Sequence, residues 1–363
     1  MSIEHAADMF EQQATACAEL GSPLYAAVLR RAAADIREGG PIAAAIAGHE
    51  DAVGPQAIAL RLLGGVHALV LTGRAPELAA HYPSAGGTFD PHRPDAPWPA
   101  LRATVADNLP WVRDWLTRPP QTNEVGRANL LITGLLCTLG ERRLPVRLFE
   151  IGASAGLNLL ADRFHCTSAG YAYGQPGSPV HLAGAWRDTP PDWLPAEPAP
   201  LVFAERRGCD LTPIEPRSAT GALALRAYVW PDQADRAARL AGALQLAEEL
   251  ATTVEPIGAA AFLRGVDVAT GTLTVVWHSI MRQYVPADEW ALVEQELDRL
   301  AAASTDDAPF AHIAFEPRRI GQEHPCVLTV RKGVEPLRLP AVAVPHGLPA
   351  WPAEPGWEAA VAV

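Results

Sequence analysis

The sequence predicts an α/β protein in two parts: an all-helical N-terminal cap domain over residues 1–145, then a domain with a mostly parallel sheet over residues 146–363. Up to about residue 145 the apolar residues recur with a helical period, and hardly any strand signal is present. From Arg147 onward, short β-type runs alternate with helical stretches, which is the pattern of βαβ units. A chain of 363 residues is long enough for two domains with well-buried cores.

Glycine and proline signals divide the helical part. A first helix ends at Gly21. Ser22 is suited to N-cap a second helix with Pro23 at its first position, and this helix stops at Gly39-Gly40. Further helices are expected over residues 54–72, 98–117 and 122–140.

The second part contains five clear β-type runs: RLFEI (147–151), PLVFAER leading into GCDL (200–211), TLTVVWHS (272–279), FAHIAFE (310–316) and CVLTVRK (326–332). Helices are expected over 155–164, 232–251 and 287–303, and a further strand over 254–263. The run 326–332 is followed by another at 338–344 with no helix between them, so we expect a terminal antiparallel pair. The Pro/Gly-rich residues 170–200 and 346–357 are interpreted as an insertion and a tail.

Composition excludes several classes of protein. Hydrophobic residues make up 49 % and charged residues 19 % of the chain, which is typical of a globular protein. The net charge of −12 argues against binding to nucleic acid or to an anionic membrane. The longest apolar stretch near a candidate span, residues 128–140, is shorter than the roughly 20 residues that a bilayer requires. No signal peptide is visible, and the five scattered cysteines fit reduced thiols in a cytoplasmic protein. The histidines show no metal-binding spacing, so no metal is expected.

The stretch LFEIGASAGLNLL (148–160) has three interpretations. Around Ser154 it is G-x-S-x-G, the nucleophile elbow of a serine hydrolase. Around Glu150 it is an acidic residue that ends a strand before a loop of small residues, a common way to hold nucleotide-type cofactors. It is also compatible with a simple tight turn between a strand and a helix.

The hydrolase interpretation needs an acid and a histidine after the serine. Candidates follow in the chain: Asp267 or Asp306 as the acid, and His312, His324 or His346 as the base. However, a hydrolase of this type has several strands before its elbow, whereas everything before residue 147 is expected to be helical. This interpretation is therefore the less favoured one.

The cofactor interpretation is supported by a second motif. In a Rossmann-like sheet the ligand lies across the carboxyl ends of the first strands. Gly152, Ala153 and Gly156 form a first loop that lets a ligand approach the backbone closely. Asp210 is expected at the end of the second strand, where a carboxylate can accept hydrogen bonds from ribose hydroxyls. The spacing G-x-x-x-G, rather than G-x-G-x-x-G, disfavours a dehydrogenase that binds NAD.

These motifs carry a family resemblance. EIGASAGLN resembles the first motif of class I S-adenosylmethionine-dependent methyltransferases, and GCDLTPI resembles the end of their second strand. The whole chain also resembles a bacterial family of unknown function, through the segments QTNEVGR (121–127), EIGASAGLNLLADR (150–163), ERRGCDL (205–211), VWPDQADR (229–236) and WHS with Tyr284 (277–284). The resemblance implies a Rossmann-like class I methyltransferase fold for the second domain.

The resemblance also implies a cofactor, S-adenosylmethionine, with S-adenosylhomocysteine as its product. Glu150 would face the methionine amino group, and Asp210 would hold the ribose hydroxyls. The implied cofactor-binding residues are Glu150, Gly152, Ala153, Ser154, Gly156, Asn158, Asp210 and Leu211. The chain departs from the family pattern where Ser154 replaces a glycine, and where Gly258 stands at the place of an acidic residue often used near adenine.

Four residues are candidates for the chemistry of methyl transfer. His278 and Tyr284, at the end of the fourth expected strand, are candidates to act as a base or to orient the acceptor. Glu124 and Arg127 lie in the most polar segment of the N-terminal half and are candidates for acceptor contacts. His278 as a structural histidine, and a helix cap at Thr122 or Asn123, are the alternatives to these roles.

The sequence therefore predicts methyl transfer from S-adenosylmethionine to a small-molecule acceptor held between the helical cap and the Rossmann-like domain. A serine hydrolase centred on Ser154 is one alternative. A non-catalytic binding protein with a methyltransferase-like fold is another, suggested by the missing acidic residue at Gly258.

Overall fold

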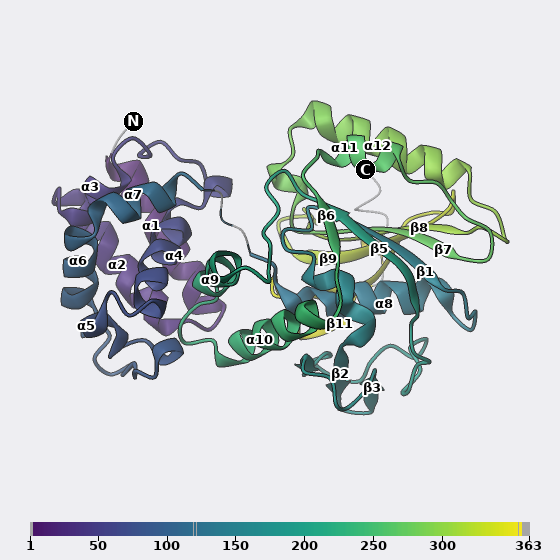
Figure 1. Ribbon diagram of the computed structural model, residues 1–363, viewed down its shortest axis with the longest axis horizontal. Helices are drawn as coiled ribbons and strands as arrows, with labels where there is room; N and C mark the ends of the chain where they lie inside the picture. Colours follow the sequence, from purple (N-terminus) through teal and green to yellow (C-terminus); the bar gives the residue numbers. More distant parts are fainter. Residues whose placement is uncertain (1–2, 119, 121, 355, 358–363) are drawn as a thin grey trace. The chain divides into compact units, whose positions relative to one another are not determined.

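The computed structural model describes residues 3–118, 120, 122–354 and 356–357, and it divides into two compact units (Figure 1). The first unit comprises Met1–Thr122 and Ser218–Ala237, and the second comprises Asn123–Arg217 and Ala238–Val363. The division differs from the expected boundary at residue 145 in two places. The apolar helix over 128–139 belongs to the second unit, and residues 218–237 belong to the first.

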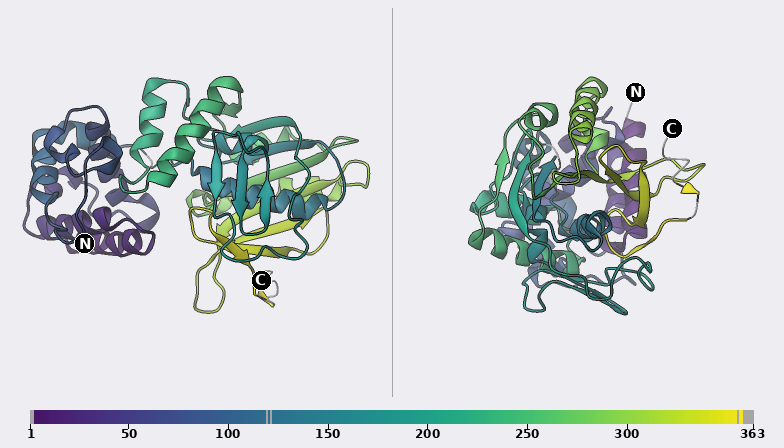
Figure 2. Two further views of the ribbon diagram at one scale, coloured as in Figure 1. Left: turned by 90° about the horizontal axis from the view of Figure 1, so that it is seen from below. Right: turned by 90° about the vertical axis from the view of Figure 1, so that its right-hand side faces the viewer.

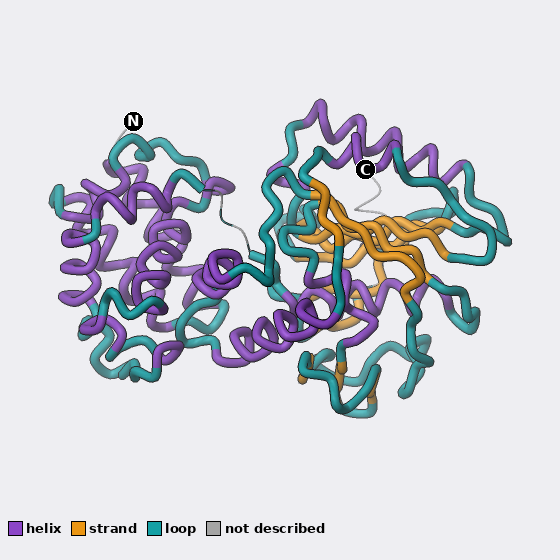
Figure 3. The backbone as a smooth tube through the Cα atoms, viewed as in Figure 1, coloured by secondary structure: helices purple, strands orange, loops and turns teal. Residues whose placement is uncertain are grey.

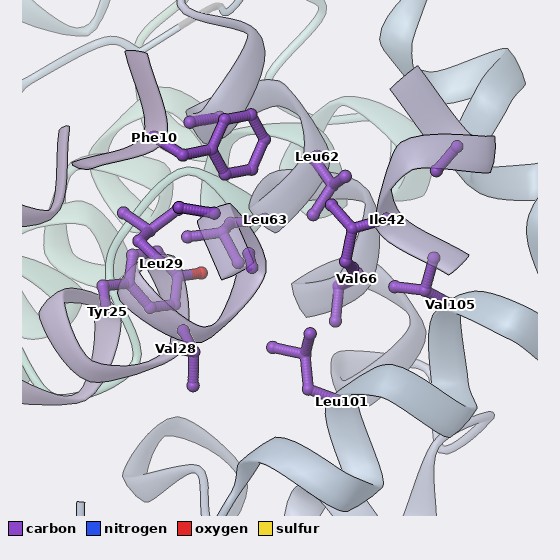
Figure 4. Packing of buried hydrophobic residues seen from close by; sticks show 14 of the residues in the cluster. Phe10, Tyr25, Val28, Leu29, Ile42, Leu62, Leu63, Val66, Leu101 and Val105 are labelled. Atoms are coloured by element: carbon purple, nitrogen blue, oxygen red, sulfur yellow. The ribbon is translucent and has the colours of Figure 1, made fainter. Parts of the chain in front are cut away.

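The first unit is built from helices around one apolar core. They are α1 (Ile3–Glu19), α2 (Pro23–Arg37), α3 (Pro41–Ile46), α4 (Ile58–Leu71), α5 (Pro76–Ala79), α6 (Trp98–Asp107), α7 (Leu109–Leu116) and α9 (Ala219–Ala227), with 3-10 turns η1 (Gly54–Gln56) and η2 (Pro83–Ala85). Phe10, Leu29, Leu63, Val66 and Leu101 pack together in this core, as Figure 4 shows. All the strands of the described residues lie in the second unit (Figure 3).

The helix-start signal at Ser22 is confirmed. Its hydroxyl accepts a hydrogen bond from the backbone N–H of Tyr25, and Pro23 is the first helical residue. The single helix expected over residues 98–117 is wrong, because α6 ends before Asn108 and α7 begins after it. Pro110 explains the break, since proline lacks a backbone N–H and its ring clashes with the carbonyl four residues earlier.

The second unit contains an eight-stranded sheet in the order β11-β10-β9-β8-β7-β1-β5-β6. The strands are β1 (Val146–Ile151), β5 (Phe203–Cys209), β6 (Thr253–Glu255), β7 (Leu273–Ser279), β8 (Phe310–Pro317), β9 (Cys326–Lys332), β10 (Arg338–Ala343) and β11 (Ala350–Pro352). Five neighbouring strands of the sheet are parallel to one another: β6, β5, β1, β7 and β8. Beyond β8, strands β9, β10 and β11 continue the sheet in antiparallel pairs. The α/β class with a mostly parallel sheet is thereby confirmed.

Helices cover both faces of this sheet (Figure 1). On one face lie α11 (Ala259–Arg264) and α12 (Ala287–Ala302). Phe262 of α11 and Trp290 of α12 belong to the same apolar cluster as Phe149 of β1. On the other face lies α8 (Ala128–Leu139), preceded by the 3-10 turn η3 (Val125–Arg127). Because successive strand residues point to opposite faces, Glu150 points away from the face that Phe149 occupies.

Three details of the second unit differ from expectation. The strand expected over 254–263 is wrong, because β6 is only three residues long and α11 occupies Ala259–Arg264. The alanine-rich sequence there favours a helix. The helix after β1 is a 3-10 helix, η4 (Leu157–Arg163). The antiparallel pairing of 326–332 with 338–344 is confirmed.

Two further parts complete the second unit. The insertion expected over 170–200 contains β3 (Tyr171–Tyr173) and β4 (His181–Ala183). Together with β2 (His165–Ser168), which precedes the insertion, they form a separate three-stranded sheet, seen from two further directions in Figure 2. α10 (Ala234–Glu249) runs across the division between the units, and a 3-10 turn, η5 (Arg282–Tyr284), follows β7. Among the described residues, no helix has both the length and the apolar character needed to cross a membrane.

Candidate functional site

The strand order of the parallel sheet points to one edge as the candidate site. Numbered along the chain, the parallel strands lie in the order third, second, first, fourth, fifth, so the order reverses between β1 and β7. In open α/β sheets, ligands bind outside the carboxyl ends of the strands at such a reversal. A ligand site is therefore expected among the residues that follow β1, β5 and β7.

Three buried polar side chains meet at this edge. Glu150 on β1 is in register with Trp277 on β7, and Asn158 on η4 is their neighbour. Glu150 is 2 % exposed, and its Oε2 atom is buried without a hydrogen-bond partner in the described part of the chain. The same is true of Asn158 Oδ1 and of Trp277 Nε1. Buried polar atoms in native proteins are nearly always paired, so this group needs an explanation.

Burial also changes the acidity of Glu150. Desolvation raises the pKa of this carboxyl group to about 8, although hydrogen-bonding interactions with the side chains of Trp277 and Asn158, and the charge of Arg127, act in the opposite direction. The Glu150 carboxyl group is therefore mostly protonated at neutral pH. A cation bound beside it would favour the ionised form.

The loop after β1 uses its backbone N–H groups within the protein. The N–H of Ala153 donates to the carbonyl of Cys209 at 2.9 Å, and that of Ser154 donates to Oδ2 of Asp210 at 3.0 Å. The N–H of Leu157 donates to Oδ1 of Asn123 at 2.8 Å. These amides are consequently not available as an anion cradle for phosphate groups, which is how helix-start loops hold dinucleotides.

Ser154 has a strained backbone. Its φ angle is +54°, in the left-handed region that non-glycine residues rarely adopt. The Asp210 carboxylate stabilises this conformation, because its two oxygens accept the N–H groups of Ser154 and Thr212. Asp210 thus lies at the end of β5, as expected, and it holds the glycine-containing loop in place.

The small residues of this loop make room for protein atoms. Gly152 has a φ angle of +69°, and a Cβ atom added to it would lie 3.0 Å from Cβ and Cγ of Met281. A Cβ atom on Gly156 would lie 2.8 Å from a methyl group of Val254. The sequence-based interpretation, that Gly152 and Gly156 leave space for a ligand, differs from this arrangement, in which side chains occupy those directions.

The polar segment before α8 lies against the same loop. Asn123 holds the N–H of Leu157, and the carbonyl of Glu124 accepts a hydrogen bond from Nδ2 of Asn158 at 3.4 Å. Oε1 of Glu124 caps η3 by accepting the N–H of Gly126. Arg127 donates to the carbonyl of Ser279 at 3.3 Å and to that of Pro345 at 3.1 Å. Gln121, in the same sequence motif, lies outside the described residues.

Arg127 therefore links this segment to the end of β7. In addition, its charge acts on both Glu150 and Tyr284. The structure brings Glu124 and Arg127 next to the predicted cofactor-binding loop.

His278 has both ring nitrogens engaged. Nδ1 lies 2.7 Å from Oε1 of Glu316 on β8, and Nε2 lies 3.1 Å from Nε2 of His312. The ring is 1 % exposed and packs edge-on against Trp290. This geometry matches the structural alternative for His278. Burial, reinforced by His278, lowers the pKa of His312 well below its usual value, so His312 is neutral.

Tyr284 and Leu211 are accessible. Tyr284 is 53 % exposed, and its pKa is raised by partial burial while Arg127 acts to lower it. Leu211, directly after Asp210, is 79 % exposed. A hollow of about 140 Å³ adjoins the loop at Ala155; residues 213–217 after β5 and Thr252 and Val254 also line it.

Three contributors to this edge were not selected from the sequence: Trp277, Met281 and Glu316. Trp277 stands beside His278 in a quoted motif, and its register with Glu150 became visible only with the sheet order. Glu316 is the last but one residue of β8, and an acidic residue near the carboxyl end of a parallel strand is a pattern that the sequence displays. The part of the chain that the structure describes contains no group of three or more potential metal ligands.

Comparisons with known proteins give one finding. Residues 7–351 match the model of a family described as "Uncharacterized protein conserved in bacteria (DUF2332)". Neither the curated proteins nor the solved structures contain a significant match. Since the match covers nearly the whole chain, the protein belongs to this bacterial family, DUF2332.

Proposed function

We propose that the protein transfers a methyl group from S-adenosylmethionine to a small-molecule acceptor, with a class I methyltransferase-like arrangement in its second unit. The observation that carries the proposal is the group of unpartnered buried atoms on Glu150, Asn158 and Trp277 at the reversal of strand order. A ligand that brings an ammonium group and a carboxylate would supply the missing partners. The methionine part of the cofactor has both groups.

The chemistry of each atom supports this assignment. An ammonium group donates hydrogen bonds, which Oε2 of Glu150 and Oδ1 of Asn158 accept. The indole N–H of Trp277 is a donor only; it interacts with the Glu150 carboxyl group in the free protein, and it also suits a carboxylate oxygen of the ligand. Because the ammonium is positive, it would also lower the pKa of the Glu150 carboxyl group from about 8.

The state of the loop amides favours a ligand without phosphate. Ala153, Ser154 and Leu157 donate their N–H groups within the chain. A pyrophosphate would compete with these bonds, whereas S-adenosylmethionine has none to place there. This argues against a dinucleotide at the same edge.

The remainder of the cofactor would extend along β5. Asp210 is half-exposed and offers carboxylate oxygens for ribose hydroxyls, and Leu211 offers an exposed apolar surface for the base. The hollow beside Ala155 lies on the same side, after β5 and next to β6. These residues fit the roles that the family resemblance implies.

The bound cofactor supplies an electrophilic methyl group on its sulfonium sulfur. The protein's part is then to align the acceptor and to exclude water. Tyr284 is the candidate to touch the acceptor, because it is accessible and close to Arg127. In this proposal Arg127, Glu124 and His278 are positioning residues, since each one holds backbone or side-chain atoms of the site.

Calorimetry with S-adenosylmethionine and S-adenosylhomocysteine tests the proposal. We expect both to bind, and Glu150→Gln to weaken both by about tenfold or more, as for a lost charge-assisted hydrogen bond. 5′-Methylthioadenosine, which lacks the amino-acid part, is the matched control, and its affinity should be the same for both proteins. No heat from the wild-type protein, or an equal effect on all three ligands, contradicts the assignment.

A serine hydrolase is the second candidate, because one observation favours it. The left-handed backbone of Ser154 is the strained conformation that a nucleophile elbow requires. Against it, Ser154 is only 7 % exposed and follows the first strand of the sheet. A fluorophosphonate probe should leave Ser154 unlabelled, and labelling that disappears in Ser154→Ala would establish the hydrolase instead.

A non-catalytic binding protein is distinguished by turnover. Such a protein would bind S-adenosylhomocysteine, yet it would release none from S-adenosylmethionine with any acceptor. Release of S-adenosylhomocysteine in the presence of a small-molecule library supports the enzyme.

A further inference from the structure

The segment that leaves β7, Ile280–Arg282, is strained. Ile280 has a φ angle of +47°. For a β-branched residue this conformation is a true outlier, because the side chain crowds the backbone, and such strain persists only where surrounding contacts enforce it. We name this segment the β7 exit segment.

Glu316 supplies the enforcing contacts. Its Oε1 atom accepts the N–H of Met281 at 3.0 Å and the N–H of Arg282 at 3.3 Å. The same oxygen pairs with Nδ1 of His278, one residue before the end of β7. Burial alone would raise the pKa of Glu316, but these hydrogen bonds, led by that from His278, lower it below its usual value.

The β7 exit segment covers the loop after β1. Met281 lies against Gly152, with its Cβ atom 3.0 Å from the position of a Cβ atom on that glycine. A side-chain rotation moves the far end of Met281 but leaves its Cβ atom in place. Clearing the space above Gly152 therefore requires the backbone of the segment to move.

We propose that the β7 exit segment is a latch, held closed by Glu316, which opens to admit a ligand to the loop at Gly152. The strain at Ile280 is released when the latch opens, and the hydrogen bonds from Met281 and Arg282 to Glu316 are lost. The latch itself is independent of the ligand's identity, and only the choice of probe rests on the function proposed above. If Met281 instead belongs to the fixed core, Gly152 is small solely to accommodate it.

Hydrogen exchange of the free protein tests the latch without a ligand. We expect the amides of Met281 and Arg282 to exchange at least about a hundredfold faster than those of Val275 and Val276 in the middle of β7, through a local opening. Glu316→Gln should accelerate them further. The matched control is Glu294→Gln, which alters the hydrogen bond to Trp290 on α12 and should leave these amides unchanged. Exchange of the segment only with global unfolding overturns the proposal.

Binding of S-adenosylhomocysteine tests what the latch covers. If the closed state dominates, affinity is reduced by the fraction of open molecules. Met281→Ala keeps the Cβ atom but removes the Cγ and Cε atoms that pack above Gly152 and stabilise the closed state. It should therefore tighten binding by up to about tenfold for an open fraction of one-tenth. Met9→Ala, a half-buried methionine of the first unit, is the matched control and should change nothing.

The outcomes separate the two proposals. Tighter binding by Met281→Ala together with local exchange supports the latch. Unchanged or weaker binding by Met281→Ala overturns the latch while the cofactor assignment stands. Absence of binding to both proteins, with local exchange retained, overturns the cofactor and supports the latch.

Discussion

Two buried carboxyl groups, one in each unit, differ in how the fold explains them. Asp35 on α2 is 3 % exposed, and its two oxygens accept hydrogen bonds from Nε of Arg102 at 2.7 Å and from the N–H of Ile42 at 2.8 Å. Glu150 on β1 is equally buried, yet its Oε2 atom has no partner within the described structure. Asp35 links three segments of the first unit, whereas Glu150 interacts with the side chains of Trp277 and Asn158 and still has one buried oxygen, Oε2, without a hydrogen-bond partner among the described residues.

The difference distinguishes structural from functional burial. A buried ion with its hydrogen bonds complete is accounted for by the fold. Glu150 differs: one of its oxygens lacks a hydrogen-bond partner in the part of the chain that the structure describes, its pKa is raised, and it lies at the reversal of strand order. A bound ligand explains such a buried carboxyl group better than the fold alone does. Strained backbone at Ser154 and Ile280 occurs at the same edge, which strengthens this explanation.

The largest loss of stability is expected from a substitution of Asp35, the buried carboxylate whose role is structural. Asp35→Asn replaces one acceptor oxygen with a donor that faces Arg102 or the N–H of Ile42. We expect the free energy of unfolding to fall by about 3 kcal/mol, because the N–H of Ile42 or the half-exposed guanidinium of Arg102 loses a hydrogen bond to a charged, buried acceptor. Urea denaturation of the variant measures this, and a loss below about 1 kcal/mol contradicts the structural role.

A smaller effect is expected from Gly208→Ala, which tests the packing under the loop. A Cβ atom at this position would lie 2.6 Å from Cβ of Ala153 and 3.0 Å from the carbonyl oxygen of Glu150. We expect destabilisation by about 1–3 kcal/mol, as for an overfilled core. Thermal unfolding measures it. The control is Gly177→Ala, because a Cβ atom there meets open space and the φ angle is not positive; it should change stability little.

The raised pKa of Glu150 is tested by the dependence of stability on pH. Glu150 has its pKa raised to about 8 in the folded protein, so between the unfolded pKa near 4.5 and pH 8 the folded state holds a proton that the unfolded state has lost. The wild-type protein should consequently lose stability relative to Glu150→Gln as the pH rises from 5 to 8. Melting temperatures of both proteins at the two pH values check this; a constant difference between them contradicts the raised pKa.

The smallest effect on stability is expected at the surface. Leu211 is largely exposed, so Leu211→Ser should change the free energy of unfolding by less than about 0.5 kcal/mol. We expect it to weaken S-adenosylhomocysteine binding, because an apolar surface for the base is lost. The same substitution at Val334, exposed on the turn between β9 and β10, is the control and should leave binding unchanged.

Local sequence signals predicted much of the fold. The strand runs beginning at 147, 272, 310 and 326 form strands within one or two residues, because apolar β-type runs there are bounded by turn residues. The helix starting after Ser22 is confirmed for the same local reason. The expected strand at 254–263 failed where alanines favoured a helix, and the expected helix at 98–117 failed at Pro110.

The site was only partly accessible from sequence. The sequence points to Glu150 and Asp210 because acidic residues at strand ends form a local pattern. Strand order decides which distant residues meet. It places Glu150 opposite Trp277, more than a hundred positions later in the chain, and His278 beside Glu316, about forty positions later. The contact of Met281 with Gly152 depends on the turn at Ile280, where φ is positive. An isoleucine in the sequence does not predict a positive φ angle, so this contact could not be predicted.

The role of Glu150 in cofactor binding is tested most directly by the number of protons released when S-adenosylhomocysteine binds at pH 7, measured by calorimetry in buffers of different ionisation enthalpy. Glu150 is mostly protonated before binding, since its pKa is about 8, and it should ionise beside the ammonium group. We therefore expect the wild-type protein to release about one proton and Glu150→Gln to release none. Absence of binding, or binding with no proton released by the wild-type protein, would contradict the assignment of this edge as the cofactor site.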